Sequence, residues 1–248
     1  MKSTLVRLAA VLVGALVAMP ASATMVQGNS LQNQLDNRTF GNSSGTVDAD
    51  FYDVEADQIS NDAIWNITAP GASTATLLFE LAGFRNANTF GIYDIFDPSN
   101  TLQIFSGSDS AGAFEVTTTG PGNSFQTVIP GGGVDSATFA TSNFGFYLSG
   151  PGGMFYSQSS LNAGNADQMI AFQGQGDIYV DATGFSPGLF TAGQFILAWE
   201  DLPFGNTDSD YNDFVVLVSN VTPVPAPAAL GLLGLALFGL GIGRRRRY

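Results

Sequence analysis

The chain has 248 residues, of which 21 are acidic and eight are basic, giving a formal net charge of −13. It contains neither cysteine nor histidine, which excludes disulfide bonds and the usual ligand sets of zinc, copper, haem and iron–sulfur sites. The same absence excludes Ser-His-Asp and Cys-His catalysis, so only a pair of carboxylates could carry out acid–base chemistry.

Residues 1–23 have the three-part layout of a secretory signal peptide. Lys2 and Arg7 make the start positive, Leu8–Met19 is apolar, and residues 21–23 (Ala-Ser-Ala) form a small-x-small cleavage pattern. A buried N-terminal helix is the alternative, but it would need an amphipathic pattern, and residues 8–19 are apolar on all sides. We therefore predict export, with a mature chain that begins at Thr24.

Residues 24–62 differ from the rest of the chain because they are rich in Asn, Gln, Asp and Ser and poor in apolar side chains. We predict an acidic, loosely ordered segment here. Five acids follow one another within ten residues: Asp48, Asp50, Asp53, Glu55 and Asp57. Because charge runs usually repel and solvate, we interpret these acids as a solvated edge in preference to a cation site.

Residues 63–222 carry short apolar runs separated by clusters of Gly, Pro, Asn and Asp. Alternation in some runs, such as Phe144, Phe146 and Leu148, is typical of strands with one buried and one solvated face. Many short strands without a helical period predict an all-β fold, a single jelly-roll-like β-sandwich with the 20 phenylalanines as core material. The predicted strands are 63–68, 75–81, 89–95, 102–105, 113–119, 124–129, 144–148, 168–172, 194–199 and 214–221. The predicted turns are 70–71, 97–100, 120–123, 131–133 and 150–153.

The densest chemical motif is the acidic segment between the last two of these strands. Its candidate metal ligands are Glu200, Asp201, Asp208, Asp210, Asn212 and Asp213. Asp208, Asp210 and Asn212 are spaced by two, which presents oxygens from alternate loop positions, as hard cations require. The segment is no EF-hand, because Asp213 and Ser219 stand where that loop needs glycine and glutamate. We predict a Ca²⁺ site, and the alternative is a turn in which Asp and Asn cap local backbone amides.

This acidic segment resembles the Glu-Asp…Asp-x-Asp-Tyr-Asn-Asp signature of a widespread bacterial extracellular domain of unknown function, the DUF4114 type. The hydrophobic run Phe214–Val218 that follows is part of the same pattern. The resemblance extends over about residues 144–221, inside the predicted sandwich domain of residues 63–222.

Residues 223–248 form a tail with three parts in a fixed order. Val224 and the two prolines Pro225 and Pro227 come first, a predicted apolar helix over residues 228–243 follows, and four arginines come last: Arg244, Arg245, Arg246 and Arg247. The apolar stretch reaches most of the way across a bilayer, and the arginines stay on the cytoplasmic side. We predict a membrane-held tail with the bulk of the protein outside.

The tail resembles the sorting signal of PEP-CTERM proteins, which occur in Gram-negative bacteria that make extracellular polysaccharide. One position departs from that pattern, since Ala226 stands where the family usually has glutamate. The resemblance implies an exosortase as partner, transient anchoring in the inner membrane, and cleavage near the proline box. A plain C-terminal anchor is the alternative. The final location would be the cell surface or the extracellular space.

The predicted mature domain carries two basic residues against 21 acidic ones and contains no lysine, a formal charge of −19. Such a surface excludes nucleic acid as a partner. The leading hypothesis is a non-catalytic surface or matrix protein, linked to exopolysaccharide or biofilm and stabilised by Ca²⁺. A carbohydrate-binding module is the first alternative, with exposed aromatics for sugar stacking: Trp65, Tyr147, Phe155 and Tyr156. A glycoside hydrolase is a remote alternative, because no pair of carboxylates stands out.

Overall fold

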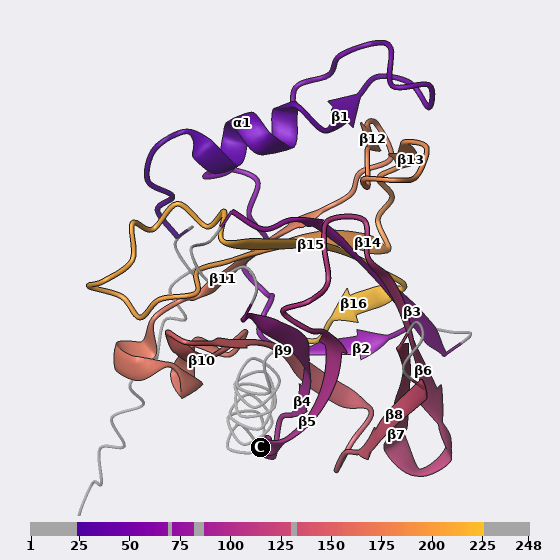
Figure 1. Ribbon diagram of the computed structural model, residues 1–248, viewed down its shortest axis with the longest axis vertical. Helices are drawn as coiled ribbons and strands as arrows, with labels where there is room; N and C mark the ends of the chain where they lie inside the picture. Colours follow the sequence, from indigo (N-terminus) through magenta and orange to yellow (C-terminus); the bar gives the residue numbers. More distant parts are fainter. Residues whose placement is uncertain (1–23, 69–70, 82–86, 130–132, 226–248) are drawn as a thin grey trace, which may run out of the picture.

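The computed structural model describes residues 24–68, 71–81, 87–129 and 133–225. Within these ranges the chain is mostly β-structure, with 44% of residues in strands and 8% in helices, and its sheets are antiparallel (Figure 1). The prediction of an all-β fold is confirmed. No helix of the described ranges is long and apolar enough to cross a membrane. The predicted signal peptide and the predicted helix over residues 228–243 lie outside the described residues.

The larger sheet has seven strands in the order β11-β14-β15-β3-β6-β7-β8. Its inner strand β15 is covered on both faces, which explains why its sequence is a continuous apolar run instead of an alternating one. In spatial order the strands are β11 (Met169–Gln173), β14 (Gln194–Trp199), β15 (Phe214–Ser219), β3 (Ala72–Phe79), β6 (Phe114–Gly120), β7 (Ser124–Ile129) and β8 (Gly133–Thr138).

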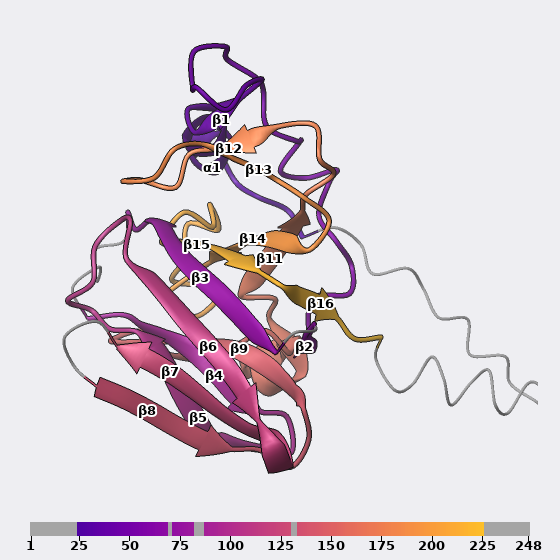
Figure 2. The same ribbon diagram turned by 90° about the vertical axis from the view of Figure 1, so that its right-hand side faces the viewer.

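The second sheet has six strands, in the order β16-β2-β9-β4-β5, with β10 paired to β9. It faces the larger sheet (Figure 2). Aromatic side chains from both sheets form the core between them. Phe90 of β4, for example, lies 5.5 Å from Phe146 of its own sheet and 5.4 Å from Phe214 of the other. The strands are β16 (Val221–Pro223), β2 (Trp65–Ile67), β9 (Asn143–Gly150), β4 (Thr89–Asp94), β5 (Asp97–Phe105) and β10 (Gly153–Tyr156).

Residues 24–62 form a cap on the outer face of the larger sheet (Figure 1). The cap contains helix α1 (Ser30–Asp36) and strand β1 (Thr39–Phe40), which joins β12 (Tyr179–Val180) and β13 (Gly188–Leu189) in a three-stranded sheet. Leu31 and Leu35 lie one helical turn apart. Both are buried in a second apolar cluster, which lies between the cap and the larger sheet and is separate from the core between the two sheets. The prediction of a loosely ordered segment is therefore wrong, because its few apolar side chains are spaced so that they meet the sheet.

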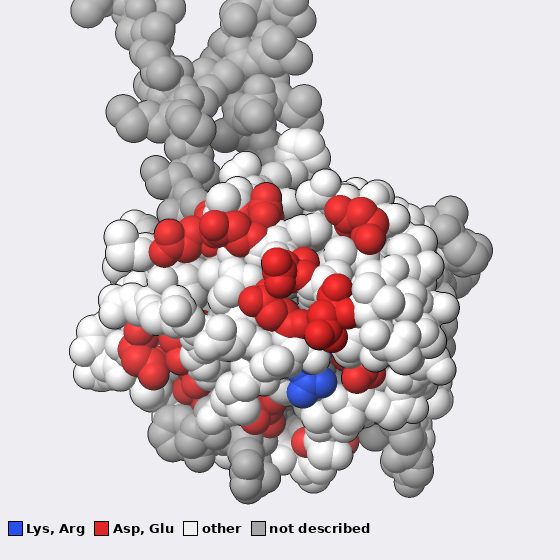
Figure 3. Space-filling view, turned by 90° about the horizontal axis from the view of Figure 1, so that it is seen from above, with Lys and Arg blue, Asp and Glu red and all other residues white. Residues whose placement is uncertain are grey.

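The surface on the side of the cap carries several separate acidic patches and one small basic patch (Figure 3). The five acids of the predicted solvated edge, from Asp48 to Asp57, are all exposed. Arg38 is the only basic residue in the described ranges, and it donates to Thr183 Oγ1 and lies over the ring of Phe79. The acids in these ranges therefore have almost no positive partner within the fold.

Each predicted strand has a counterpart, but three details of the prediction are wrong. Residues 97–100, expected as a turn, begin the edge strand β5, where Pro98 is tolerated because an edge needs fewer backbone donors. The run 214–221 is broken at Asn220, which has a φ of 58° and directs the chain to the other sheet as β16. Strand β9 is covered on both faces, since Tyr147 is buried as well. Three short 3₁₀ turns span Pro121–Asn123, Ser159–Leu161 and Ala163–Asn165.

Candidate metal centre

The acidic loop, residues 200–213, connects β14 to its antiparallel neighbour β15. Trp199 and Phe214 are paired across the two strands, so the loop begins and ends at the same end of this strand pair. Asp201, two residues after the end of β14, donates its backbone N–H to Asp213 Oδ2, at 3.0 Å. The hydrogen bond closes the base of the loop and crowds its acids into one place.

Three of the predicted ligands meet in this loop. The carboxylate oxygens of Glu200, Asp208 and Asp210 lie within 4.8 Å of one another. Two oxygens that bind one Ca²⁺ at about 2.3–2.6 Å can be at most about 5 Å apart, so these carboxylates fit around a single calcium ion. Glu200 is completely buried, Asp210 is half-buried and Asp208 is exposed, which leaves one side of the cluster open to solvent.

Glu200 is the unusual member of this cluster. Its Oε1 accepts a hydrogen bond from the backbone N–H of Tyr211 at 2.6 Å, whereas its Oε2 is buried without a hydrogen-bond partner. Burial raises the pKa of Glu200 to about 8, the Tyr211 N–H opposes this, and the charges of Asp213, Asp208 and Asp210 add to the rise. A buried carboxylate oxygen without a partner is costly, and a bound cation would supply the missing partner.

Asp210 and Asn212 connect the cluster to the cap. Asp210 Oδ1 accepts the backbone N–H of Asn212 at 3.2 Å, and its Oδ2 accepts the Asn212 side-chain amide. The same amide donates to Ser30 Oγ at the start of α1, at 2.7 Å. Burial is the main reason why the pKa of Asp210 is raised, and the charge of Asp208 contributes. Asn212 therefore braces the loop against the cap.

Asp201 and Asp213 hold the loop to the rest of the fold. Asp201 Oδ2 accepts a hydrogen bond from Asn88 Nδ2 at 2.9 Å, in front of β4. Burial raises the pKa of Asp213 to about 7, against the lowering effect of the Asp201 N–H and with the help of the nearby negative charges. The predicted alternative, Asp and Asn as caps of local amides, thus describes Asp213 and one side of Asp210.

The backbone of the loop is held in an uncommon conformation. Ser209 and Tyr211 have positive φ angles of 58° and 54° without being glycine. A bulky residue in this region costs on the order of 1–3 kcal/mol, and such outliers gather at functional sites. Tyr211 is completely buried, and its hydroxyl donates to the backbone oxygen of Asp167 at 2.5 Å. This conformation points the Tyr211 N–H at Glu200.

Several supporting residues come from distant segments and carry no local sequence signal: Ser30, Asn88, Gly152, Asp167 and Gln168. Gln168 Nε2 donates to the backbone oxygen of Leu202 at 2.8 Å. Gly152 lies so close to the loop that a Cβ atom there would be 2.0 Å from the backbone oxygen of Asp201. The glycine cluster at 150–153 was interpreted only as a turn, but one of its glycines also makes room for the acidic loop.

The predicted sugar-stacking surface is not formed. Trp65, Tyr147 and Phe155 are buried, and Trp65 packs 4.9 Å from Phe195 in the core between the sheets. Only Tyr156 of the four predicted aromatics is partly exposed. Tyr147 is buried because its strand, β9, is covered on both faces.

The residues of the predicted sorting signal lie at and beyond the end of the described chain. Val224 and Pro225 directly follow β16, and the Val224 N–H donates to the backbone oxygen of Ile64 at 2.8 Å. Pro227 and the arginines 244–247 lie outside the described residues.

The fold and its loop define an all-β domain with an acidic, partly buried loop between two adjacent core strands. A DUF4114 domain is found at residues 120–220, where the sequence matches this family, described as a domain of unknown function. The match begins earlier than the predicted position near 144. It lacks β3 and β6, which lie in the middle of the larger sheet, so the folded unit is larger than the matched segment. A search of the curated proteins found no match.

Proposed function

We propose that this protein is an exported, non-catalytic surface or matrix protein whose β-domain is stabilised by Ca²⁺ in the acidic loop. The observation that carries the calcium proposal is the buried, unpartnered Oε2 of Glu200 beside the carboxylates of Asp208 and Asp210. Only oxygen ligands are offered, which favours a hard cation. Mg²⁺ is the poorer fit, because it demands a small octahedral shell and sheds water reluctantly.

The position of the loop supports a structural role for the ion. Through Ser30 the loop contacts the cap, through Asn88 it contacts the start of β4 in the second sheet, and it is itself the connection between β14 and β15. An ion that orders the loop would therefore fix the cap and both sheets to one another. A chain without disulfides gains most from such a link.

For delivery, we propose sorting by an exosortase through the tail that begins at Val224. The support is positional, since the proline box follows directly after β16, the last strand of the domain. Prolines favour extended backbone and resist helix formation, which would make such a box accessible to a membrane enzyme. In this proposal the protein is held transiently at the inner membrane and then released to the surface, where exopolysaccharide is its environment.

The calcium proposal is tested by thermal melting of residues 24–225 with and without Ca²⁺. This fragment contains every described strand and both apolar clusters, including β16. Binding to the folded state alone stabilises it by RT ln(1 + [L]/Kd), about 2.7 kcal/mol at a hundredfold excess over Kd. The melting temperature should rise by roughly 5–11 °C, taking about 2–4 °C per kcal/mol. Magnesium should produce a much smaller rise.

The double variant Asp208→Asn, Asp210→Asn should lose the calcium response. It should be no less stable than the wild type in chelator, because it relieves repulsion. Asp48→Asn, Asp50→Asn is the matched control, since it removes the same charge from exposed positions of the cap and should keep the response. Equal melting temperatures in calcium and in chelator for the wild type would refute the calcium site.

Delivery is tested separately in a strain that lacks the exosortase. The full-length protein should then accumulate in the inner membrane, detected by immunoblotting of membrane and medium fractions. Normal release of a shortened form from that strain would rule out exosortase sorting.

A further inference from the structure

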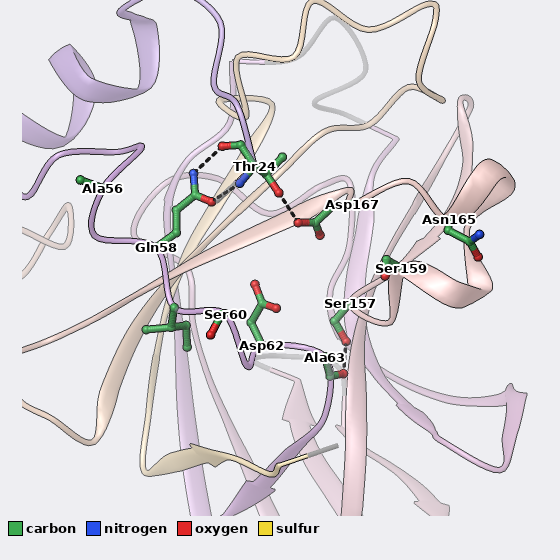
Figure 4. A pocket seen from close by; sticks show the side chains of 11 residues that line it. Thr24, Ala56, Gln58, Ser60, Asp62, Ala63, Ser157, Ser159, Asn165 and Asp167 are labelled. Atoms are coloured by element: carbon green, nitrogen blue, oxygen red, sulfur yellow. Dashed lines mark hydrogen bonds between the residues drawn. The ribbon is translucent and has the colours of Figure 1, made fainter. Parts of the chain in front are cut away.

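A polar cavity lies below the cap, at the point where the predicted mature chain begins. It has a volume of about 480 Å³, and Thr24, Gln58, Asp62, Ser157 and Asp167 are among the residues that line it (Figure 4). The Asp62 and Asp167 side chains come from different segments and both point into the cavity. In the described chain no basic residue lines it.

Thr24 is held in this cavity by hydrogen bonds from both its backbone and its side chain. Its backbone nitrogen donates to Gln58 Oε1 at 2.8 Å, and its backbone oxygen accepts from Gln58 Nε2 at 2.8 Å. Its hydroxyl donates to Asp167 Oδ2 (Figure 4). Gln58 Nε2 also donates to the Val54 backbone oxygen at 2.7 Å, which fixes the amide that receives the Thr24 nitrogen. The position of the nitrogen is therefore defined by the fold.

The charges around Thr24 are all negative. Asp62 and Asp167 line the cavity, and Asp53 and Glu55 line a neighbouring hollow of about 330 Å³ that Thr24 also lines. Burial raises the pKa of Asp62 well above its ordinary value, with a contribution from the Asp167 charge, and burial also raises that of Asp167. Two carboxylates thus line the cavity that holds this backbone nitrogen and two more line the neighbouring hollow, whereas a peptide nitrogen carries no charge to balance them.

We infer that this cavity is a binding site for the α-ammonium group of Thr24, which is created when the signal peptide is removed. Cleavage of the Ala23–Thr24 peptide bond by water leaves a carboxylate on Ala23 and an amine on Thr24, which takes up a proton at neutral pH. The new ammonium keeps its hydrogen bond to Gln58, and its additional N–H groups can donate to the carboxylates in the cavity. The precursor lacks this cation, so processing itself stabilises the mature fold. This inference rests on the proposed export.

The chain offers an unusually direct test, because Lys2 is its only lysine. In a chain from Thr24 to Tyr248 the α-amine is the only primary amine. This chain, released from a removable fusion so that it begins at Thr24, is kept in mild detergent and chelator. Its acetylation by acetic anhydride is followed by mass spectrometry between pH 6 and pH 10, with a peptide of the sequence of residues 24–28 as internal reference.

The midpoint of the pH dependence should lie at least about one unit above that of the peptide, whose amine titrates near the ordinary value of about 7.7–8.0. Asp167→Asn and Asp62→Asn should each lower the midpoint. Asp135→Asn removes a charge from the exposed edge strand β8 and should leave the midpoint unchanged. One added glycine before Thr24 moves the ammonium out of the cavity and should restore a midpoint near 8.

Mere burial of the amine would slow acetylation at every pH without raising the midpoint. A wild-type midpoint equal to that of the peptide, or one insensitive to both aspartate changes, overturns the inference. The recombinant chain makes this result independent of export and of calcium binding. N-terminal sequencing of the protein from the cell envelope tests processing separately, and a cellular chain that begins elsewhere than Thr24 overturns the inference for the cell.

Discussion

Glu115 provides a test of the electrostatics of the core that is independent of the acidic loop. It lies on β6 opposite Ala75 of β3, is 3% exposed, and its Oε2 has no hydrogen-bond partner. Burial, and secondarily the charge of Asp109, raises the pKa of Glu115 from 4.5 to about 7. The folded state therefore binds more protons than the unfolded state between these two values, and stability falls as pH rises through this window.

The size of the effect follows from the same difference in pKa. At about 1.36 kcal/mol per pKa unit, the rise from 4.5 to about 7 corresponds to an upper limit of about 3 kcal/mol above pH 7. We expect about 1–3 kcal/mol, because solvent near the end of the sheet screens part of it. In Glu115→Gln the free energy of unfolding should depend less on pH, by this amount. The stability of the variant relative to the wild type should therefore rise between pH 5 and pH 8.

The assay is urea unfolding of residues 24–225 in chelator at several pH values. The other acids titrate equally in both proteins and cancel in the difference. A constant cost of burying the glutamine amide also cancels, because only the change of the difference with pH is used. Asp109→Asn should reduce the wild-type slope as well, and Asp135→Asn on the exposed β8 should not. A difference between Glu115→Gln and wild type that is the same at pH 5 and pH 8 would refute the reasoning.

Two further substitutions test the packing and the bracing of the loop by urea unfolding. A Cβ atom at Gly145 would lie 2.2 Å from the buried ring of Tyr93, so Gly145→Ala should cost about 1–3 kcal/mol, whereas Gly188→Ala, with open space around it, should cost far less. Asn88→Ala removes the donor to the buried carboxylate of Asp201 and should cost about 1–3 kcal/mol. Equal stabilities of Gly145→Ala and Gly188→Ala would contradict the packing argument. An unchanged stability after Asn88→Ala would contradict the bracing of the loop by Asn88.

The strands were largely predictable because their apolar runs and turn clusters are local signals. Strand β8 (Gly133–Thr138) was missed for the same reason, since it is an edge strand with almost every side chain exposed and has no apolar pattern. The cap was missed because Leu31, Leu35 and Phe51 are few and far apart in the sequence. They become a packed layer only when the outer face of the larger sheet is present to receive them.

The candidate ligands were predictable as a set, but the choice among them was not. Glu200, Asp208 and Asp210 converge because Ser209 and Tyr211 adopt positive φ angles, which their residue types do not suggest. Asp201 is turned away by Asn88, more than a hundred residues earlier in the chain. Which of the candidate acids converge depends on contacts between distant segments, so it cannot be predicted from their spacing in the sequence.

One residue, Tyr211, connects the acidic loop to the amine cavity. Tyr211 donates its backbone N–H to Glu200 and its hydroxyl to the backbone of Asp167, so it connects the proposed calcium cluster to the wall of the proposed ammonium site. Each site consists of carboxylates that the fold brings close without a basic side chain. A cation in one site fixes Tyr211 and thereby one wall of the other, and by linkage the benefit must be mutual. Processing and calcium would then favour the same folded state.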